Sequence, residues 1–124
     1  MQKAHRPVSH GVPHATVRIS NRDFVASPGQ PIVFGRVDDD EVVGLEAADM
    51  GISAVAGSVE WDGWWFVVNN SRKCKLFLEH GGGVQPLDCG HRHAISVERL
   101  TVQVRGAIRT HEIRVTSRPR SSLA

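Results

Sequence analysis

Three short segments of this sequence carry side chains suited to binding one anionic group. Phe34-Gly35-Arg36 ends an apolar run, and Gly51-Ile52-Ser53 precedes the next one. If both segments are loops at one sheet edge, Arg36 offers a bidentate guanidinium and Ser53 a hydroxyl donor to a single phosphate. The segment Asn70-Ser71-Arg72-Lys73 adds two cations between two apolar runs. Each of these side chains is ordinary at a protein surface when taken singly, but together they predict a composite anion site.

Short strands are the elements that would position these loops. Helical periodicity is almost absent, and apolar residues alternate with polar ones in short segments separated by Gly, Pro, Asn and Asp. The segment 46–50 is too short for a stable helix and is predicted to be a loop or a single turn. The expected strands cover residues 15–20, 24–25, 31–34, 42–45, 55–61, 64–69, 76–80, 84–87, 91–95, 100–104 and 110–115. This spacing predicts an all-β fold, an antiparallel β-sandwich of about eleven strands.

The tryptophan-rich segment predicts a β-hairpin. Asp62-Gly63 is a dipeptide that favours a two-residue type I′ turn, which would place Trp61 opposite Trp64. Trp64 and Phe66 would then share one face, and Trp65 and Val67 the other. An exposed Trp65 would mark a partner surface, although packing in the core or under a tail is the favoured alternative.

Length and composition indicate one domain. The 124 residues are expected to form a domain at 14–116 between disordered tails at 1–13 and 117–124. The N-terminus lacks the apolar stretch of a secretory signal and no apolar run could span a bilayer, so we expect a cytoplasmic protein without a membrane partner. The excess of Arg over Lys suggests a bacterial source.

The charge balance argues against a generic polyanion partner. With 15 basic and 13 acidic residues the formal net charge is +2, whereas nucleic-acid binding needs concentrated basic surface. A salt-sensitive contact through the Arg-rich C-terminal hairpin is the minor alternative.

Cysteine and histidine residues form a second, weaker constellation. Cys74, His80, Cys89, His91 and His93 are soft or borderline metal ligands, but their spacing lacks the paired ligands of zinc sites. We therefore assign no metal and no cofactor, and a Cys/His metal-binding protein stays a lower alternative. No nucleophile elbow or phosphate-binding glycine loop before a helix is present, so no enzyme is predicted.

The order of these motifs resembles the forkhead-associated (FHA) domain, an FHA/SMAD-like sandwich of about eleven strands that binds phosphothreonine peptides through its apical loops. The resemblance runs from about Val17 to Val115. It places the family's Gly-Arg on Gly35-Arg36 and its phosphate-binding Ser on Ser53, and of its later Ser-x-Asn-Gly-Thr motif only the Ser matches, at Ser71.

Two departures from the family pattern bear on activity. Ala56 stands where the family has a supporting His, and Lys73 stands where an Asn holds the peptide backbone. Lys73 supplies charge but no acceptor. Either Arg36, Ser53, Arg72 and Lys73 form a more cationic phosphate site, or the fold serves as a phospho-independent scaffold.

The resemblance implies a non-catalytic interaction module that binds phosphorylated proteins in Ser/Thr kinase signalling. The expected phosphopeptide-binding residues are Arg36, Ser53, Ser71, Arg72 and Lys73. The acidic loop 38–41 follows Arg36 directly and has three interpretations: a solvated loop, a selector of basic residues beside the phosphate, or a partner of Arg72 and Lys73 that closes the site. The partner protein, the peptide preference and the oligomeric state are left open.

Overall fold

Eleven strands form two sheets in the structure, a computed structural model that describes residues 12–118. The strands are β1 His14–Ile19, β2 Arg22–Ala26, β3 Ile32–Gly35, β4 Val43–Gly44, β5 Gly57–Trp61, β6 Trp65–Asn69, β7 Leu76–His80, β8 Gly83–Leu87, β9 Arg92–Ala94, β10 Arg99–Arg105 and β11 Thr110–Arg118. Each of the eleven predicted segments overlaps one of them. The prediction of an all-β sandwich of about eleven strands is confirmed.

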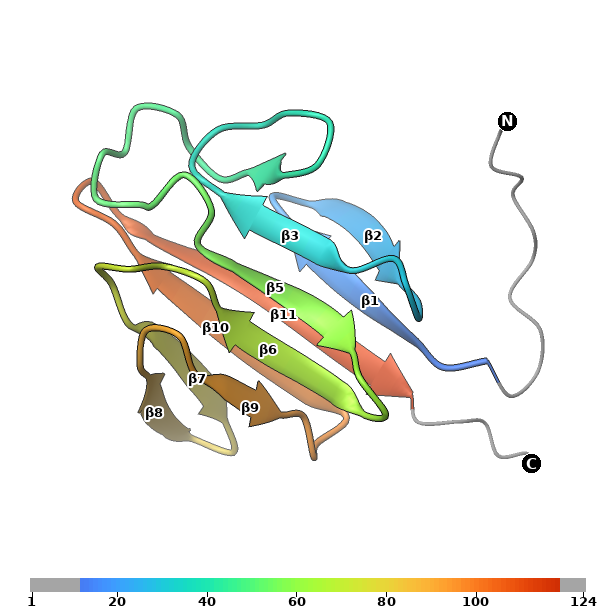
Figure 1. Cartoon of the computed structure of the whole chain (residues 1–124). Coiled ribbons are helices and arrows are strands. Elements are labelled where there is room, and N and C mark those ends of the chain that lie inside the picture. The colour runs from blue at the N-terminus through green and yellow to red at the C-terminus, as the bar shows by residue number, and fades with distance from the viewer. Residues whose placement is uncertain (1–11, 119–124) are drawn as a thin grey trace.

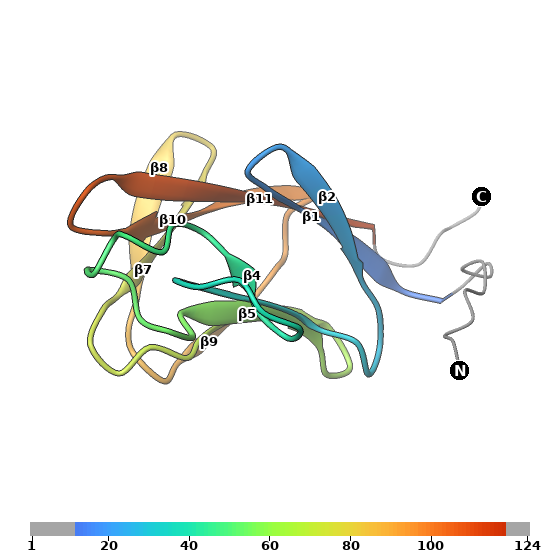
Figure 2. The same cartoon turned by 90° about the horizontal axis from the view of Figure 1, so that it is seen from above.

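The two sheets stack face to face (Figure 2). The six-stranded sheet has the order β2-β1-β11-β10-β7-β8, and the five-stranded sheet has the order β4-β3-β5-β6-β9. All pairs are antiparallel except β3 with β4, which is parallel. The termini of the sandwich adjoin, because β1 pairs with β11 along its whole length.

The core lies between the sheets and follows from the alternation along the strands. Buried residues alternate with more exposed ones along most of β1, β6, β7, β10 and β11, as a sheet with one face on the core requires. The fully buried side chains include Val17, Phe34, Val67, Leu78 and Val102. Burial of these apolar side chains is the main favourable term holding the sheets together.

The β5–β6 hairpin differs from its prediction by one residue. Its loop is Asp62-Gly63-Trp64, closed by a 2.9 Å hydrogen bond from the Asp62 N–H to the Trp64 carbonyl, with Gly63 at a φ of 76°. A three-residue loop with glycine in the left-handed region pairs Trp61 with Trp65 instead of Trp64. The prediction that Trp61 faces Trp64 was therefore wrong.

This register decides which tryptophan is exposed. Trp65 is 2% exposed and packs edge to face on Trp61 at 5.3 Å between ring centroids, whereas Trp64 is 45% exposed. A shift of one residue moves every side chain of a strand to the other face. The hypothesis of an exposed Trp65 is therefore wrong, and core packing, its favoured alternative, is what the structure shows.

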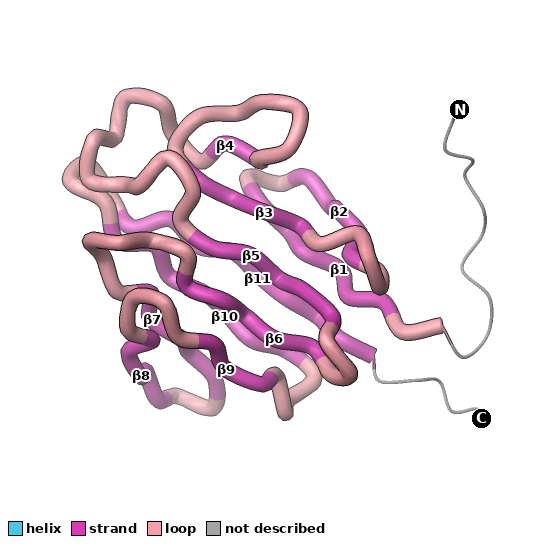
Figure 3. The backbone as a smooth tube through the Cα atoms, viewed as in Figure 1, coloured by secondary structure: helices cyan, strands magenta, loops and turns pink. Residues whose placement is uncertain are grey.

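The loops that concern function gather at one end of the sandwich. In Figures 1 and 3 the β3–β4, β4–β5, β6–β7 and β10–β11 connections lie at the end away from the start of β1 and the end of β11. The segment 46–50 forms turns, and residues 12–118 contain no helix. The same residues contain no long apolar helix able to cross a membrane.

The domain boundaries can be compared only at the strand ends. Strand β1 starts at His14, and β11 continues to Arg118, two residues beyond the expected boundary at 116. Of the predicted tails at 1–13 and 117–124, residues 1–11 and 119–124 lie outside the described residues, and Ser117 and Arg118 belong to β11.

Candidate functional site

The close approach of two loops brings Arg36 beside Ser53. The backbone N–H of Arg36, directly after β3, donates to the Ser53 carbonyl at 3.1 Å. The preceding Gly35 is required by this approach, because a Cβ there would collide with the carbonyl oxygen of Ala54. The Gly-Arg pair thus combines a residue that permits contact with one that presents charge.

Four of the five predicted site residues line one pocket. Arg36, Ser53, Arg72 and Lys73 surround a volume of about 430 Å³, and its remaining lining residues are Met50, Ile52, Ala54, Val55 and Asn70. The pocket is formed by the end of β3, the segment before β5 and the β6–β7 loop. Three cations and a hydroxyl therefore line one pocket, an arrangement suited to a compact anion.

The fifth predicted residue, Ser71, does not line the pocket but contacts Ser53 and orients its hydroxyl. Ser71 is 3% exposed, and its Oγ lies 2.7 Å from Ser53 Oγ. Ser71 Oγ already accepts hydrogen bonds from the backbone N–H groups of Lys73 at 3.1 Å and Cys74 at 3.0 Å. Because a hydroxyl has two lone pairs and one proton, Ser71 donates its own proton to Ser53. The proton of Ser53 is then free for a ligand.

Asn69 holds the β6–β7 loop that carries Arg72 and Lys73. It is completely buried at the end of β6. Its Nδ2 donates to the carbonyls of Cys74 at 2.9 Å and Leu87 at 2.8 Å, and its Oδ1 accepts from the Ser71 N–H at 2.8 Å. One amide side chain thus satisfies three main-chain groups at once.

The acidic loop does not neutralise the pocket in this structure. Asp38 accepts from the Gly44 N–H at 2.8 Å, and Asp39 accepts from the N–H groups of Glu41 and Val42, both at 2.8 Å. Among residues 12–118 no ion pair joins this loop to Arg36, Arg72 or Lys73. The interpretation in which the loop closes the site by pairing with Arg72 and Lys73 therefore has no support.

Arg36 is instead steadied by a neutral group. Its Nη1 donates to the Ala47 carbonyl at 3.1 Å. A carbonyl orients the guanidinium without cancelling its charge, so the remaining N–H groups stay available to an anion.

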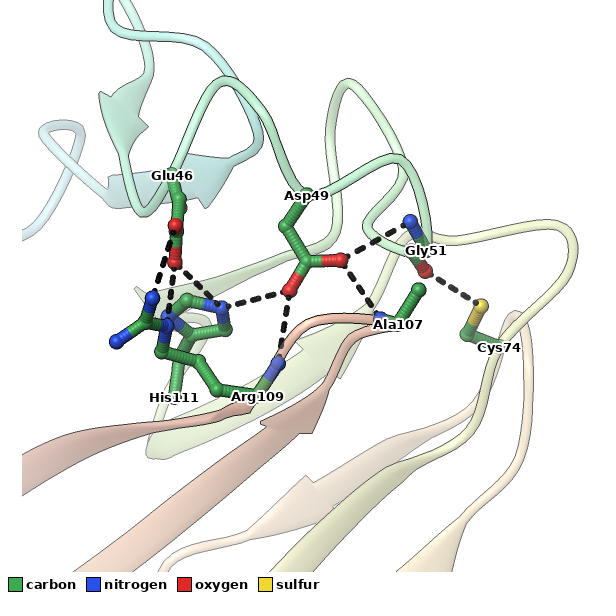
Figure 4. Close-up of polar contacts among 7 residues, drawn as sticks. All are labelled: Glu46, Asp49, Gly51, Cys74, Ala107, Arg109 and His111. Atoms are coloured by element: carbon green, nitrogen blue, oxygen red, sulfur yellow. Dashed lines mark hydrogen bonds and ion pairs between the residues drawn. The ribbon is translucent and has the colours of Figure 1, made fainter.

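A buried carboxylate fastens the segment before β5 to the β10–β11 turn (Figure 4). Asp49 is 0% exposed. One of its oxygens accepts from the N–H groups of Gly51 at 3.1 Å and Ala107 at 2.6 Å, and the other from the Arg109 N–H at 3.3 Å and His111 Nε2 at 3.1 Å. These contacts brace the loops with polar groups, whereas Ala56 nearby in the sequence is buried and apolar.

The hydrogen bonds keep Asp49 ionised. Burial acts to raise the pKa of this carboxyl, but the hydrogen bonds from His111 and from the backbone N–H groups, Ala107 among them, outweigh it and hold the pKa far below its usual range. An ionised carboxylate only accepts, so His111 carries its proton on Nε2.

Glu46 completes this network and has the spacing of a possible metal ligand. Its carboxylate, Asp49 and His111 offer three ligand atoms within 4.8 Å of one another. Arg109 already contacts Glu46 through Nε at 2.8 Å and Nη2 at 3.3 Å, and four hydrogen bonds occupy Asp49. The cluster is therefore an internal ion-pair network that supports the loops.

The predicted Cys/His constellation is not assembled. Within residues 12–118 no three of Cys74, His80, Cys89, His91 and His93 bring ligand atoms together. Cys74 Sγ donates to the Gly51 carbonyl and Cys89 Sγ to the Cys74 carbonyl, so both thiols serve loop packing. Burial and the nearby His80 lower the pKa of His93, which favours its neutral form.

Asn69 and Asp49 are supporting residues that the sequence analysis did not single out. Asn69 had a usable signal, because alternation from Trp65 through Val67 places it on the core face, where a polar group needs partners. Asp49 had none, since its partner His111 is 62 positions away.

Comparison with known proteins identifies the type of fold. No family model and no curated protein matches this sequence. Among solved structures, the crystal structure of Mycobacterium tuberculosis Rv1747 FHA-1 is similar with a TM-score of 0.62 and 20% sequence identity, covering 86% of this chain and 97% of that chain. The chain therefore has an FHA-like fold, as the motif order predicted.

Proposed function

We propose, with the FHA-like sandwich as premise, that this chain is a non-catalytic interaction module that binds phosphothreonine-containing segments of proteins in Ser/Thr kinase signalling. The observation that carries the proposal is the convergence of Arg36, Ser53, Arg72 and Lys73 on one pocket. A phosphate there would receive hydrogen bonds from charged donors, which are about twice as strong as neutral ones.

Each residue has a distinct role in this proposal. Arg36 is the oriented fork, since its Nη1 is held by the Ala47 carbonyl. Ser53 donates the hydroxyl proton that its contact with Ser71 leaves free. Arg72 and Lys73 are exposed and add charge at the mouth of the pocket. Ser71 acts through Ser53 and is a positioning residue.

The test is a titration of the chain with phosphothreonine peptides and their unphosphorylated twins, repeated with Arg36→Ala and Ser53→Ala. We expect phosphate-dependent binding that weakens at least about tenfold in Arg36→Ala, since a charged hydrogen bond contributes about 1.5–3 kcal/mol. Lys75→Ala is the matched control, because Lys75 pairs with Asp88 at 3.7 Å and does not line the pocket.

Two results would contradict the proposal. Equal binding of phosphorylated and plain peptides would favour the phospho-independent scaffold, for which the departures at Ala56 and Lys73 already argue. An equal loss in Lys75→Ala and Arg36→Ala would show that general surface charge, and not the pocket, attracts the peptide.

A further inference from the structure

The two cysteines of the sequence flank the β7–β8 hairpin and have no part in the proposed function. Cys74 lies just before β7 and Cys89 just after β8, 15 positions apart. Both thiols are free, and neither cysteine is fully buried. Between them, the last pair of the β7–β8 ladder is Leu76 opposite Leu87. A small reagent can therefore reach two thiols that lie beyond the same end of one hairpin.

The register of this hairpin directs the two cysteines toward each other. One position beyond the last pair of the ladder come Lys75 and Asp88, whose Nζ and Oδ1 form an ion pair at 3.7 Å. The two chains therefore stay side by side where the ladder has ended. One position further come Cys74 and Cys89. Because side chains alternate along extended chains, both cysteines lie on the face of the buried leucine pair and not on the exposed face of the ion pair.

Printed contacts across the hairpin end agree with this register. Cys89 Sγ lies 3.3 Å from the Cys74 carbonyl oxygen. Asn69 Nδ2 donates to the carbonyls of Cys74 at 2.9 Å and Leu87 at 2.8 Å, so one amide spans the two chains. A disulfide needs Cα atoms about 4.4–6.8 Å apart, and facing residues of an antiparallel pair, at about 4.5–5.5 Å, meet this requirement.

We propose that Cys74 and Cys89 form a reversible disulfide by exchange with a low-molecular-weight disulfide such as oxidised glutathione. One cysteine, as its thiolate, attacks a sulfur of the small disulfide, whose S–S bond breaks and releases one small thiol. The other cysteine then attacks the protein sulfur of this mixed disulfide and releases the second small thiol. The two protein thiols give up two electrons and two protons, and the small disulfide takes up both.

The disulfide changes what holds the β6–β7 loop. In the reduced chain, Cys74 Sγ donates to the Gly51 carbonyl at 3.4 Å and so joins this loop to the segment before β5 (Figure 4). A disulfide sulfur carries no proton, so the contact with Gly51 is lost on oxidation. Cys74 is then tied covalently to the β8–β9 turn instead. Bond formation does not depend on phosphopeptide binding, and it can be measured without any peptide.

The test equilibrates the chain with a buffer of reduced and oxidised glutathione, once in the folded state and once unfolded in concentrated urea. Acid quenching, alkylation of the remaining thiols and mass spectrometry of the digested chain give the fraction that carries the internal disulfide. We expect its equilibrium constant to be at least about tenfold larger in the folded chain, because the hairpin already holds Cys74 and Cys89 together. The same factor should appear as greater resistance of the oxidised chain to urea.

Cys74→Ser and Cys89→Ser are the matched controls, since each keeps one thiol and a hydroxyl that can replace the lost S–H donor. Each should form only a mixed disulfide with glutathione. In the original chain, a folded-state equilibrium constant less than about tenfold above the unfolded one overturns the proposal. Oxidation that yields only mixed disulfides or disulfides between chains also overturns it. These measurements use the original chain, so a serine variant that fails to fold does not affect the result.

Discussion

Removal of the Asn69 side chain should destabilise the whole domain while leaving its surface unchanged. Asn69→Ala deletes two hydrogen bonds to the carbonyls of Cys74 and Leu87 and one from the Ser71 N–H. Asn69 is completely buried, so water does not replace these partners without the loop opening. The perturbation thus leaves main-chain groups unpaired inside the protein.

The size of the effect follows from these three groups. A buried donor or acceptor left without a partner costs about 1–3 kcal/mol. The Cys74 carbonyl keeps a weak contact from Cys89 Sγ at 3.3 Å. The cost of removing its hydrogen bond to Asn69 therefore lies at the low end of this range. We expect Asn69→Ala to lower the free energy of unfolding by about 3–5 kcal/mol, a large part of the roughly 5–15 kcal/mol of a typical domain.

Urea denaturation followed by tryptophan fluorescence measures this loss, because Trp61 and Trp65 lie in and beside the core. Asn70→Ala is the control: Asn70 is exposed and its side chain makes one 3.2 Å hydrogen bond to Ser58 Oγ, so we expect a cost below about 1 kcal/mol. Asn69→Asp keeps the volume and the acceptor but removes both donors, and it should be as harmful as Asn69→Ala. A mild Asn69→Asp would show that lost packing, and not lost hydrogen bonding, causes the destabilisation.

Three other predictions test the loops around the pocket. Ser71→Ala should weaken phosphopeptide binding about fivefold because Ser53 loses its orienting donor; unchanged affinity would refute the assigned proton direction. Because folding lowers the pKa of Asp49, the stability from this carboxylate is present above about pH 4 and lost as the pH falls toward its folded value. In urea denaturation from pH 2 to 7, the stability difference between the chain and Asp49→Asn should therefore shrink in acid; a constant difference would contradict the reasoning. Gly35→Ala should cost about 1–3 kcal/mol of unfolding free energy, since its Cβ would collide with the Ala54 carbonyl; a variant that melts like the original would show that the loops separate freely.

The positions of the strands and the residue types in the loops are local properties that can be predicted directly from the sequence. Alternation such as Leu100, Val102 and Val104 depends only on the two-residue period of a strand, and all three side chains are buried in the structure. The pocket residues Arg36 and Ser53 are likewise recognisable from types and spacing, because Arg36 directly follows an apolar strand and Ser53 lies in the segment before the next long one.

The register of the β5–β6 hairpin could not be predicted from the sequence, because it depends on the conformation of one turn. Asp62-Gly63 is compatible with loops of two or three residues, and these loops place opposite faces of the strand toward the core. The longer loop in the structure buries Trp65 and exposes Trp64. A difference of one residue in the turn thus decided which tryptophan is available to a partner.

The sequence by itself determined an all-β fold of eleven strands and the set of cations and hydroxyls at its loops. Only the tertiary structure decided how these groups act together. Asp49 meets His111 across 62 positions, and Ser71 meets Ser53 across 18. The physical reason is that strand periodicity depends on residues close together in the sequence. Hydrogen-bond direction and charge pairing depend instead on which loops the folded sheets bring into contact.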